Sequence, residues 1–157
     1  MKTLKNTIVN IFLLFIFISS IVLILSVPVY SAQWYFAAAT KNRYYFVDAE
    51  NINISDTNVT FWIMNMDIIT GKVRSIKRCT IDCAVDTCTI SEVYRYDRNG
   101  TILYVTSYAN NLEWYVVPHD SATESIEKLL CSDGQPRSNI KEYLMILFGE
   151  VKQQILQ

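Results

Sequence analysis

Short runs of aromatic and β-branched residues, separated by polar turns, fill most of the chain between residue 33 and Pro118. This pattern is typical of β-strands. It predicts strands over residues 33–39, 43–48, 59–66, 73–83, 87–97, 102–108 and 113–117. Asn99-Gly100, between two of these runs, predicts a hairpin with a type I′ turn, because both central residues of that turn need positive φ. The sheet is therefore expected to be mainly antiparallel.

After Pro118 the apolar residues recur at helical intervals. Ser121 with Glu124 three residues later has the spacing of a capping box, which predicts a helix start there. The segment "SDGQPRS" ends this helix, and a second helix is predicted to begin near Asn139. Its apolar stripe comprises Ile140, Tyr143, Leu144, Leu147, Phe148, Val151 and Ile155. We expect an α+β fold in which the stripe packs on the sheet; a dimer contact or a membrane-surface face is the alternative.

The N-terminus has the pattern of a targeting segment. Lys2 and Lys5 precede an apolar run over residues 8–27, and Pro28 then stops any helix. We expect a signal peptide over residues 1–31, cleaved after Ser31 or Ala32. The alternative is an uncleaved membrane anchor, since the run approaches the roughly 20 residues that span a bilayer. Either reading places residues 32–157 outside the cytoplasm.

Charge and cysteine content narrow the class of protein further. Without residues 1–31 the chain keeps 12 basic and 15 acidic residues, a formal charge of −3, which argues against nucleic acid as a partner. The cysteines are Cys79, Cys83, Cys88 and Cys131. Their spacing matches neither a zinc site nor a C-x-x-C redox motif, and the one histidine is His119. In an exported chain we expect two structural disulfides, with three connectivities open.

Positive charges gather around the first cysteine. Lys72, Arg74, Lys77 and Arg78 lie within seven residues, which makes them the candidate partner-binding residues. On a strand Arg74 and Arg78 would point away from the face that Cys79 shares with Val73, Ile81 and Cys83. An ordinary solvated face, or an edge strand charged against aggregation, is the competing interpretation. The tyrosines offer a second possible surface: Tyr35, Tyr44, Tyr45, Tyr94, Tyr96, Tyr104 and Tyr108.

No catalytic constellation is found in the sequence. His119, Asp120 and Ser121 are contiguous, and adjacent residues do not easily align a nucleophile, a base and an orienting group. Asp48 and Glu50 form a carboxylate pair, but no second pair can be placed opposite them. There is no phosphate loop and no dinucleotide fingerprint. We therefore expect a protein that is not an enzyme, with no catalytic residue, metal or cofactor.

A series of segments resembles the surface-adhesin E family of exported bacterial proteins. The matching pieces, in order, are Trp34, "YYFVDAENI", "VTFWIMN", "IDC" ending at Cys83, "YRYDRNGTIL" and "WYVVPHDSATESIEKLLC" ending at Cys131. The resemblance implies an antiparallel sheet with a helix against it, and attachment to host extracellular proteins or cells. It also implies that Cys83 pairs with Cys131, which leaves Cys79 and Cys88 for a second bridge. The chain departs from the family in its extra cysteine pair, in lacking a lipid-attachment cysteine, and in its second helix.

These observations predict three segments: residues 1–31 as signal peptide or anchor, 32–134 as a surface-adhesin E-like domain, and 135–157 as an amphipathic C-terminal helix. The predicted function is non-enzymatic binding of a protein partner at the bacterial surface or envelope, with a host extracellular protein as the candidate partner. The alternative is a periplasmic envelope protein that is tethered through residues 8–27 and forms a homodimer.

Overall fold

A computed structural model describes residues 32–108 and 110–155, with side chains as far as residue 147. The predicted targeting segment, residues 1–31, lies outside the described residues, as do the side chains of Phe148, Val151 and Ile155. Residues from Ala32 onward form one compact unit. Within the described ranges, no helix combines the length and apolar character needed to cross a bilayer.

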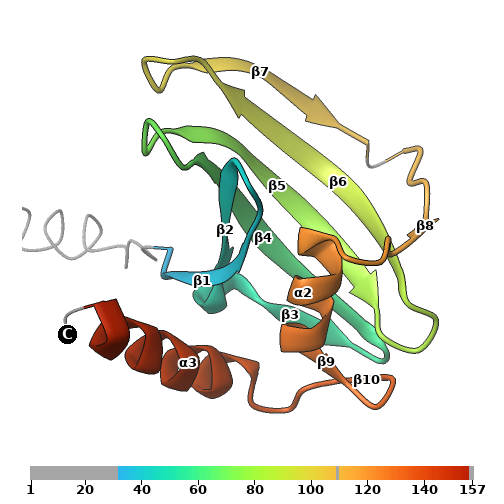
Figure 1. The fold of residues 1–157 in the computed structure, drawn as a ribbon. Coiled ribbons are helices and arrows are strands. Elements are labelled where there is room, and N and C mark those ends of the chain that lie inside the picture. Colours follow the sequence, from blue (N-terminus) through green and yellow to red (C-terminus); the bar gives the residue numbers. More distant parts are fainter. Residues whose placement is uncertain (1–31, 109, 156–157) are drawn as a thin grey trace, which may run out of the picture. The chain divides into compact units, whose positions relative to one another are not determined.

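The α+β fold predicted from the sequence is confirmed (Figure 1). Every strand pairing is antiparallel, and the sheet has the order β1-β2-β4-β5-β6-β7. The main strands are β1 (Trp34–Ala39), β2 (Arg43–Asp48), β4 (Asn58–Asp67), β5 (Val73–Asp82), β6 (Thr87–Tyr96) and β7 (Ile102–Ser107). Short β3 (Asn53–Ser55) pairs with β4, and β8 (Tyr115–Val116) pairs with the first residues of β6.

In residues 32–108 and 110–155, three helical elements accompany the sheet. They are the 3-10 turn η1 (Ala49–Asn51), α2 (Ala122–Leu130) and α3 (Ile140–Ile155), and a small hairpin of β9 (Cys131–Ser132) and β10 (Gln135–Pro136) joins the last two. Alternation along β4 places Val59, Phe61 and Ile63 on the inner face of the sheet, where each is buried. Ile126 and Leu130 of α2 pack in the same core, so α2 covers this inner face.

The stripe of α3 packs on its own domain at its N-terminal end. Ile140 and Leu144 are buried in the core cluster, and α3 contacts β1, η1 and α2. Lys141 forms an ion pair with Glu50 of η1. Met145 and Ile146 remain exposed on another side of the helix. The C-terminal helix is therefore part of the same compact unit as the sheet.

A disulfide joins Cys83, just after β5, to Cys131 at the end of α2, with Cα atoms 5.6 Å apart. The pairing implied by the resemblance is thus confirmed. The predicted second disulfide is not formed in the structure: Cys79 and Cys88 are both free thiols. Cys79 lies opposite Ile90 and Cys88 opposite Ile81, so the two thiols are diagonal neighbours rather than a directly opposed pair.

The β6–β7 hairpin forms at the predicted position, but its turn is not type I′. Of the pair Asn99-Gly100, only Gly100 has a positive φ, +85°. The Asp97 carboxylate accepts hydrogen bonds from the backbone N–H groups of Asn99 and Thr101, at 2.7 and 2.8 Å. Asp97 therefore closes a wider turn, and the register shifts between Arg95 and Tyr96.

Candidate functional site

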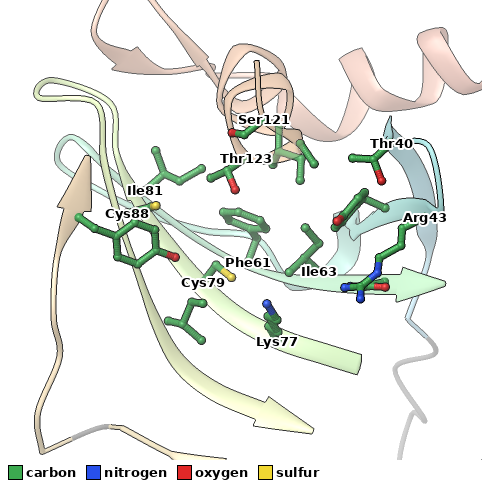
Figure 2. A pocket seen from close by; sticks show the side chains of 16 residues that line it. Thr40, Arg43, Phe61, Ile63, Lys77, Cys79, Ile81, Cys88, Ser121 and Thr123 are labelled. Carbon is green, nitrogen blue, oxygen red and sulfur yellow. The ribbon is translucent and has the colours of Figure 1, made fainter. Parts of the chain in front are cut away.

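A cavity of about 350 Å³ lies between α2 and the inner face of the sheet. We call it the α2 cavity; Figure 2 shows Ser121 and Thr123 of the helix across from Lys77 and Cys79 of the sheet. Its apolar lining comprises Phe61, Ile63, Ile81, Ile90, Ala122 and Ile126. The size falls at the lower end of the roughly 300–1,000 Å³ typical of small-molecule pockets, which are mostly apolar with few polar groups.

The strand register places three polar side chains that line this cavity on neighbouring strands. Asn65 lies opposite Tyr45 on β2 and opposite Ser75 on β5. Arg43 comes two residues before Tyr45 and Lys77 two residues after Ser75, so the two cations flank Asn65 on opposite diagonals. Diagonal positions are about 7–8 Å apart, within reach of long side chains. The sheet thus places one cation on either side of a buried amide along the cavity wall.

Both free thiols also line the α2 cavity. Burial raises the pKa of Cys79 from 9.0 to about 12, although the charge of Lys77 acts in the opposite direction. Burial also raises the pKa of Cys88, which the hydrogen bond to the Tyr115 hydroxyl partly offsets. Because the thiolate is the nucleophile and the metal ligand, both cysteines behave at neutral pH as small apolar groups.

The four predicted partner-binding residues do not form one surface. Arg74 pairs with Asp67 at 3.0 Å, and Arg78 pairs with Glu92 at 3.3 Å. Lys72 donates a hydrogen bond to the carbonyl of Arg98, whereas Lys77 lines the cavity on the opposite face from Arg78. β5, which holds Arg74, Lys77 and Arg78, lies between β4 and β6, so it is not a protected edge. Partner binding by this set stays a prediction.

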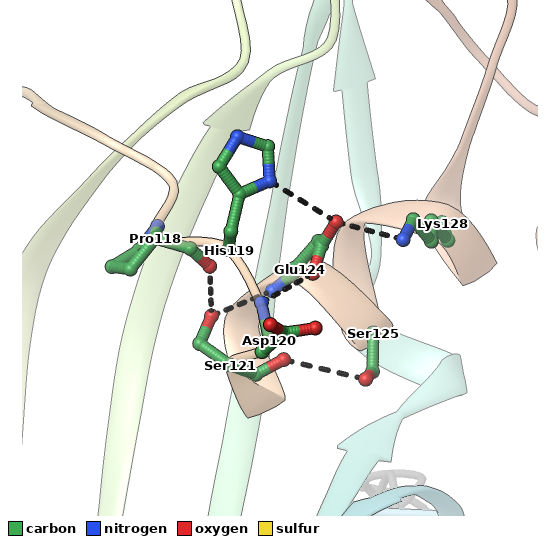
Figure 3. Close-up of polar contacts among 7 residues, drawn as sticks. All are labelled: Pro118, His119, Asp120, Ser121, Glu124, Ser125 and Lys128. Atoms are coloured by element: carbon green, nitrogen blue, oxygen red, sulfur yellow. Dashed lines mark hydrogen bonds and ion pairs between the residues drawn. The ribbon is translucent and has the colours of Figure 1, made fainter.

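The segment from Pro118 to Ser125 builds a helix cap (Figure 3). Ser121 Oγ accepts a hydrogen bond from the N–H of Glu124 at 3.1 Å and donates one to the carbonyl of Pro118. The Glu124 carboxylate accepts from the N–H of Asp120 rather than that of Ser121, which differs from the predicted reciprocal box. Exposed His119 lies 3.6 Å from the same carboxylate. Hydrogen bonds of Lys128 and Asp120 to Glu124 lower its pKa.

Acidic residues elsewhere serve turns and packing. Buried Asp48 caps η1 and accepts hydrogen bonds from the N–H of Glu50 and from Asn51 Nδ2, so the predicted carboxylate pair is structural. Asp67 accepts from the Thr70 backbone and from Arg74, which together lower its pKa to about 2. In the part of the chain that the structure covers, no cluster of His, Cys, Asp and Glu is arranged to hold a metal ion.

The largest run of exposed apolar side chains lies along β7 and the segment that follows it. Its members are Ile102, Leu103, Tyr104, Val105, Tyr108, Leu112, Trp114, Tyr115 and Val116. We call residues 102–116 the β7 ribbon. Leu103 and Val105 are 61% and 52% exposed although they lie in a paired strand. Glu113 is the only charged residue between Thr101 and Val116.

β7 is also an edge of the sheet, pairing only with β6. Figure 1 places it at the border of the sheet farthest from β1 and α3. Natural edge strands usually carry charges or prolines that prevent another chain from pairing with them, and β7 carries neither. The ribbon thus offers both unpaired backbone groups and apolar side chains to a partner.

Sequence analysis grouped Lys77 with Lys72, Arg74 and Arg78, whereas Lys77 lines the α2 cavity on the opposite face of β5 from Arg78, and it did not single out Arg43 or Asn65. Asn65 in the otherwise apolar run "VTFWIMNM" was the available signal, because strand parity with Phe61 and Ile63 puts it on the core face. The sequence predicted the β7 strand, but which strand would end the sheet was not readable from it.

An antiparallel sheet joined to one helix by a disulfide defines a disulfide-bonded α+β domain. The chain belongs to the surface-adhesin protein E family, whose model matches residues 34–132. Membership of this family indicates an adhesin-like binding role at the cell surface. No curated protein and no solved structure matches the chain.

Proposed function

We propose that this protein is an exported, non-enzymatic adhesin that holds a protein partner through the β7 ribbon, with residues 1–31 as its targeting segment. The observation that carries the proposal is the unprotected apolar edge strand β7, with Leu103 and Val105 more than half exposed. Family membership supports a binding role at the surface.

The chemistry of the ribbon favours a particular kind of partner. An extended peptide segment that adds to a sheet edge gains main-chain hydrogen bonds, and alternate side chains supply specificity. Tyr104 and Thr106 lie opposite Arg95 and Val93 on the inner face, whereas Leu103 and Val105 alternate with them. We infer a partner segment with an extended backbone and apolar side chains, presented by a host extracellular protein.

Attachment of bacteria that display the protein to a host epithelial monolayer tests this proposal. Leu103→Lys with Val105→Lys places charges on the outer side of the edge strand and is expected to lower attachment at least about tenfold, the effect of losing central interface residues. Treating the monolayer with protease is expected to have the same effect. Ile69→Lys is the matched control, since Ile69 is an exposed apolar residue of the β4–β5 turn.

Equal attachment by the wild type and the double lysine variant would contradict the assignment to the β7 ribbon. Attachment that survives protease treatment would contradict a protein partner. Thermal melts of both variants show whether the domain is still folded, so that lost attachment can be ascribed to the surface.

A separate measurement tests whether the protein is exported. The intact mass of the protein recovered from its envelope fraction, together with protease accessibility on whole cells, tests the targeting segment. A mass lacking residues 1–31 and digestion from outside agree with a surface adhesin. A full-length mass with protection from external protease would contradict surface exposure and favour a tethered periplasmic protein.

A further inference from the structure

Several polar side chains that line the α2 cavity have no hydrogen-bond or ion-pair partner among the described residues. Lys77 and Arg43 have no ion pair or side-chain hydrogen bond among the residues that the structure describes, whereas Arg74 and Arg78 of the same strand as Lys77 each pair with an acid. None of the residues lining the cavity is acidic. The two cations therefore face the cavity with no internal counter-charge.

Asn65 adds an independent observation. Its side chain is buried, with the residue only 4% exposed, and its Oδ1 has no hydrogen-bond partner among the described residues. A buried polar atom without a partner carries a desolvation cost, so native structures usually satisfy it with protein, water or ligand. The vacant acceptor of Asn65 lies diagonally between the two unpaired cations.

We propose that the α2 cavity binds a small hydroxy acid with an apolar tail. The carboxylate accepts hydrogen bonds from Lys77 and Arg43, and the neighbouring hydroxyl donates one to Asn65 Oδ1. The apolar tail lies against Phe61, Ile63 and Ile81, beside thiols that remain uncharged. The first turn of α2, where Ala122 and Thr123 line the cavity, adds the positive end of a helix dipole.

Of the residues that line the α2 cavity, Tyr115 also belongs to the β7 ribbon, but Lys77, Arg43 and Asn65 do not, and the proposal does not rest on the adhesive function. An adhesin with a second, small-molecule site could sense or carry that molecule. Failure of the attachment experiment would leave the cavity's binding unaffected, and failure of the binding experiment below would leave the attachment result unaffected.

Isothermal titration calorimetry of the purified full-length protein with 3-hydroxyoctanoate tests the proposal. Octane-1,3-diol keeps the hydroxyl and tail but lacks the charge, and octanoate lacks the hydroxyl. We expect the diol to bind at least about tenfold more weakly, as for the loss of a charge-assisted hydrogen bond, and octanoate to bind a few-fold more weakly. Raising the salt concentration should weaken the acids more than the diol.

Single-residue variants test whether 3-hydroxyoctanoate binds at Lys77 in the α2 cavity. Lys77→Met keeps the apolar stem and is expected to weaken binding of 3-hydroxyoctanoate about tenfold, while Lys77→Arg should restore it to within a few-fold. Lys72→Met is the matched control, because Lys72 loses the same charge outside the cavity. Equal affinity for acid and diol, undiminished binding by the folded Lys77→Met variant, or no binding at millimolar concentration would each overturn the proposal.

Discussion

Cys83 and Cys131 join the end of β5 to the end of α2 across 48 residues of sequence, and both are buried in the core. The bond connects the sheet to the helix that forms the other wall of the α2 cavity. Loss of this connection therefore affects both the stability of the domain and the position of α2.

Replacing both Cys83 and Cys131 by alanine is expected to lower the free energy of unfolding by about 2–5 kcal/mol, as for other small disulfide-bonded domains. Urea denaturation of the full-length protein measures the effect, and reductant should reproduce it in the wild type. Cys79→Ala is the control: Cys79 forms no disulfide, so its replacement should lower the free energy of unfolding by less. A melt that shifts with chelator and ignores reductant would contradict this account.

The two free thiols are expected to react very slowly in the native protein. With the pKa of Cys79 raised to about 12, its thiolate fraction near pH 8 is about a thousandfold lower than that of an ordinary thiol. Intact-mass measurement during treatment with iodoacetamide should show little alkylation in buffer and two alkylated residues in urea. If neither Cys79 nor Cys88 were alkylated in urea, the two residues would instead be joined by a second disulfide.

Removal of the α2 cap should destabilise the domain modestly. Ser121→Ala leaves the N–H of Glu124 without its acceptor and is expected to cost about 1 kcal/mol. Ser125→Ala is the matched control, because exposed Ser125 donates only a weak bond, 3.3 Å long, to the carbonyl of Ser121. In thermal melts, Ser121→Ala should have a lower melting temperature than Ser125→Ala. Equal melting temperatures would argue against a stabilising cap.

Glu127 is expected to make stability depend on pH. Burial raises its pKa above 4.5, and the negative charge of Asp86 raises it further. A raised pKa favours the protonated carboxyl in the folded state, so its contribution is present below about pH 4.5 and lost as the pH rises through the folded value.

The comparison of the wild type with Glu127→Gln isolates this effect. The variant should gain stability relative to the wild type between about pH 4.5 and neutral pH, measured by urea denaturation at each pH. Glu142→Gln removes the same charge from an exposed helix position and serves as the control. A difference between wild type and Glu127→Gln that does not change with pH would show that folding does not raise the pKa of Glu127.

The sequence by itself determined the local elements. Short runs of aromatic and β-branched residues between polar turns predicted β1, β2 and β4 to β7 within a residue or two, because such side chains favour strands over a local stretch of chain. The pair Ser121 and Glu124 predicted the start of α2, since a cap needs only neighbouring residues. The series of matching segments also placed the chain in its family, which residues 34–132 confirm.

The tertiary structure alone decided which distant residues meet. The gathering of Arg43, Asn65 and Lys77 depends on the register of three strands, and strand parity does not specify register between strands. The separation of Cys79 from Cys88 depends on a four-residue turn and a bulge in the β5–β6 pair. The exposure of the β7 ribbon depends on the strand order of the whole sheet, because the same apolar run would be buried in a central strand.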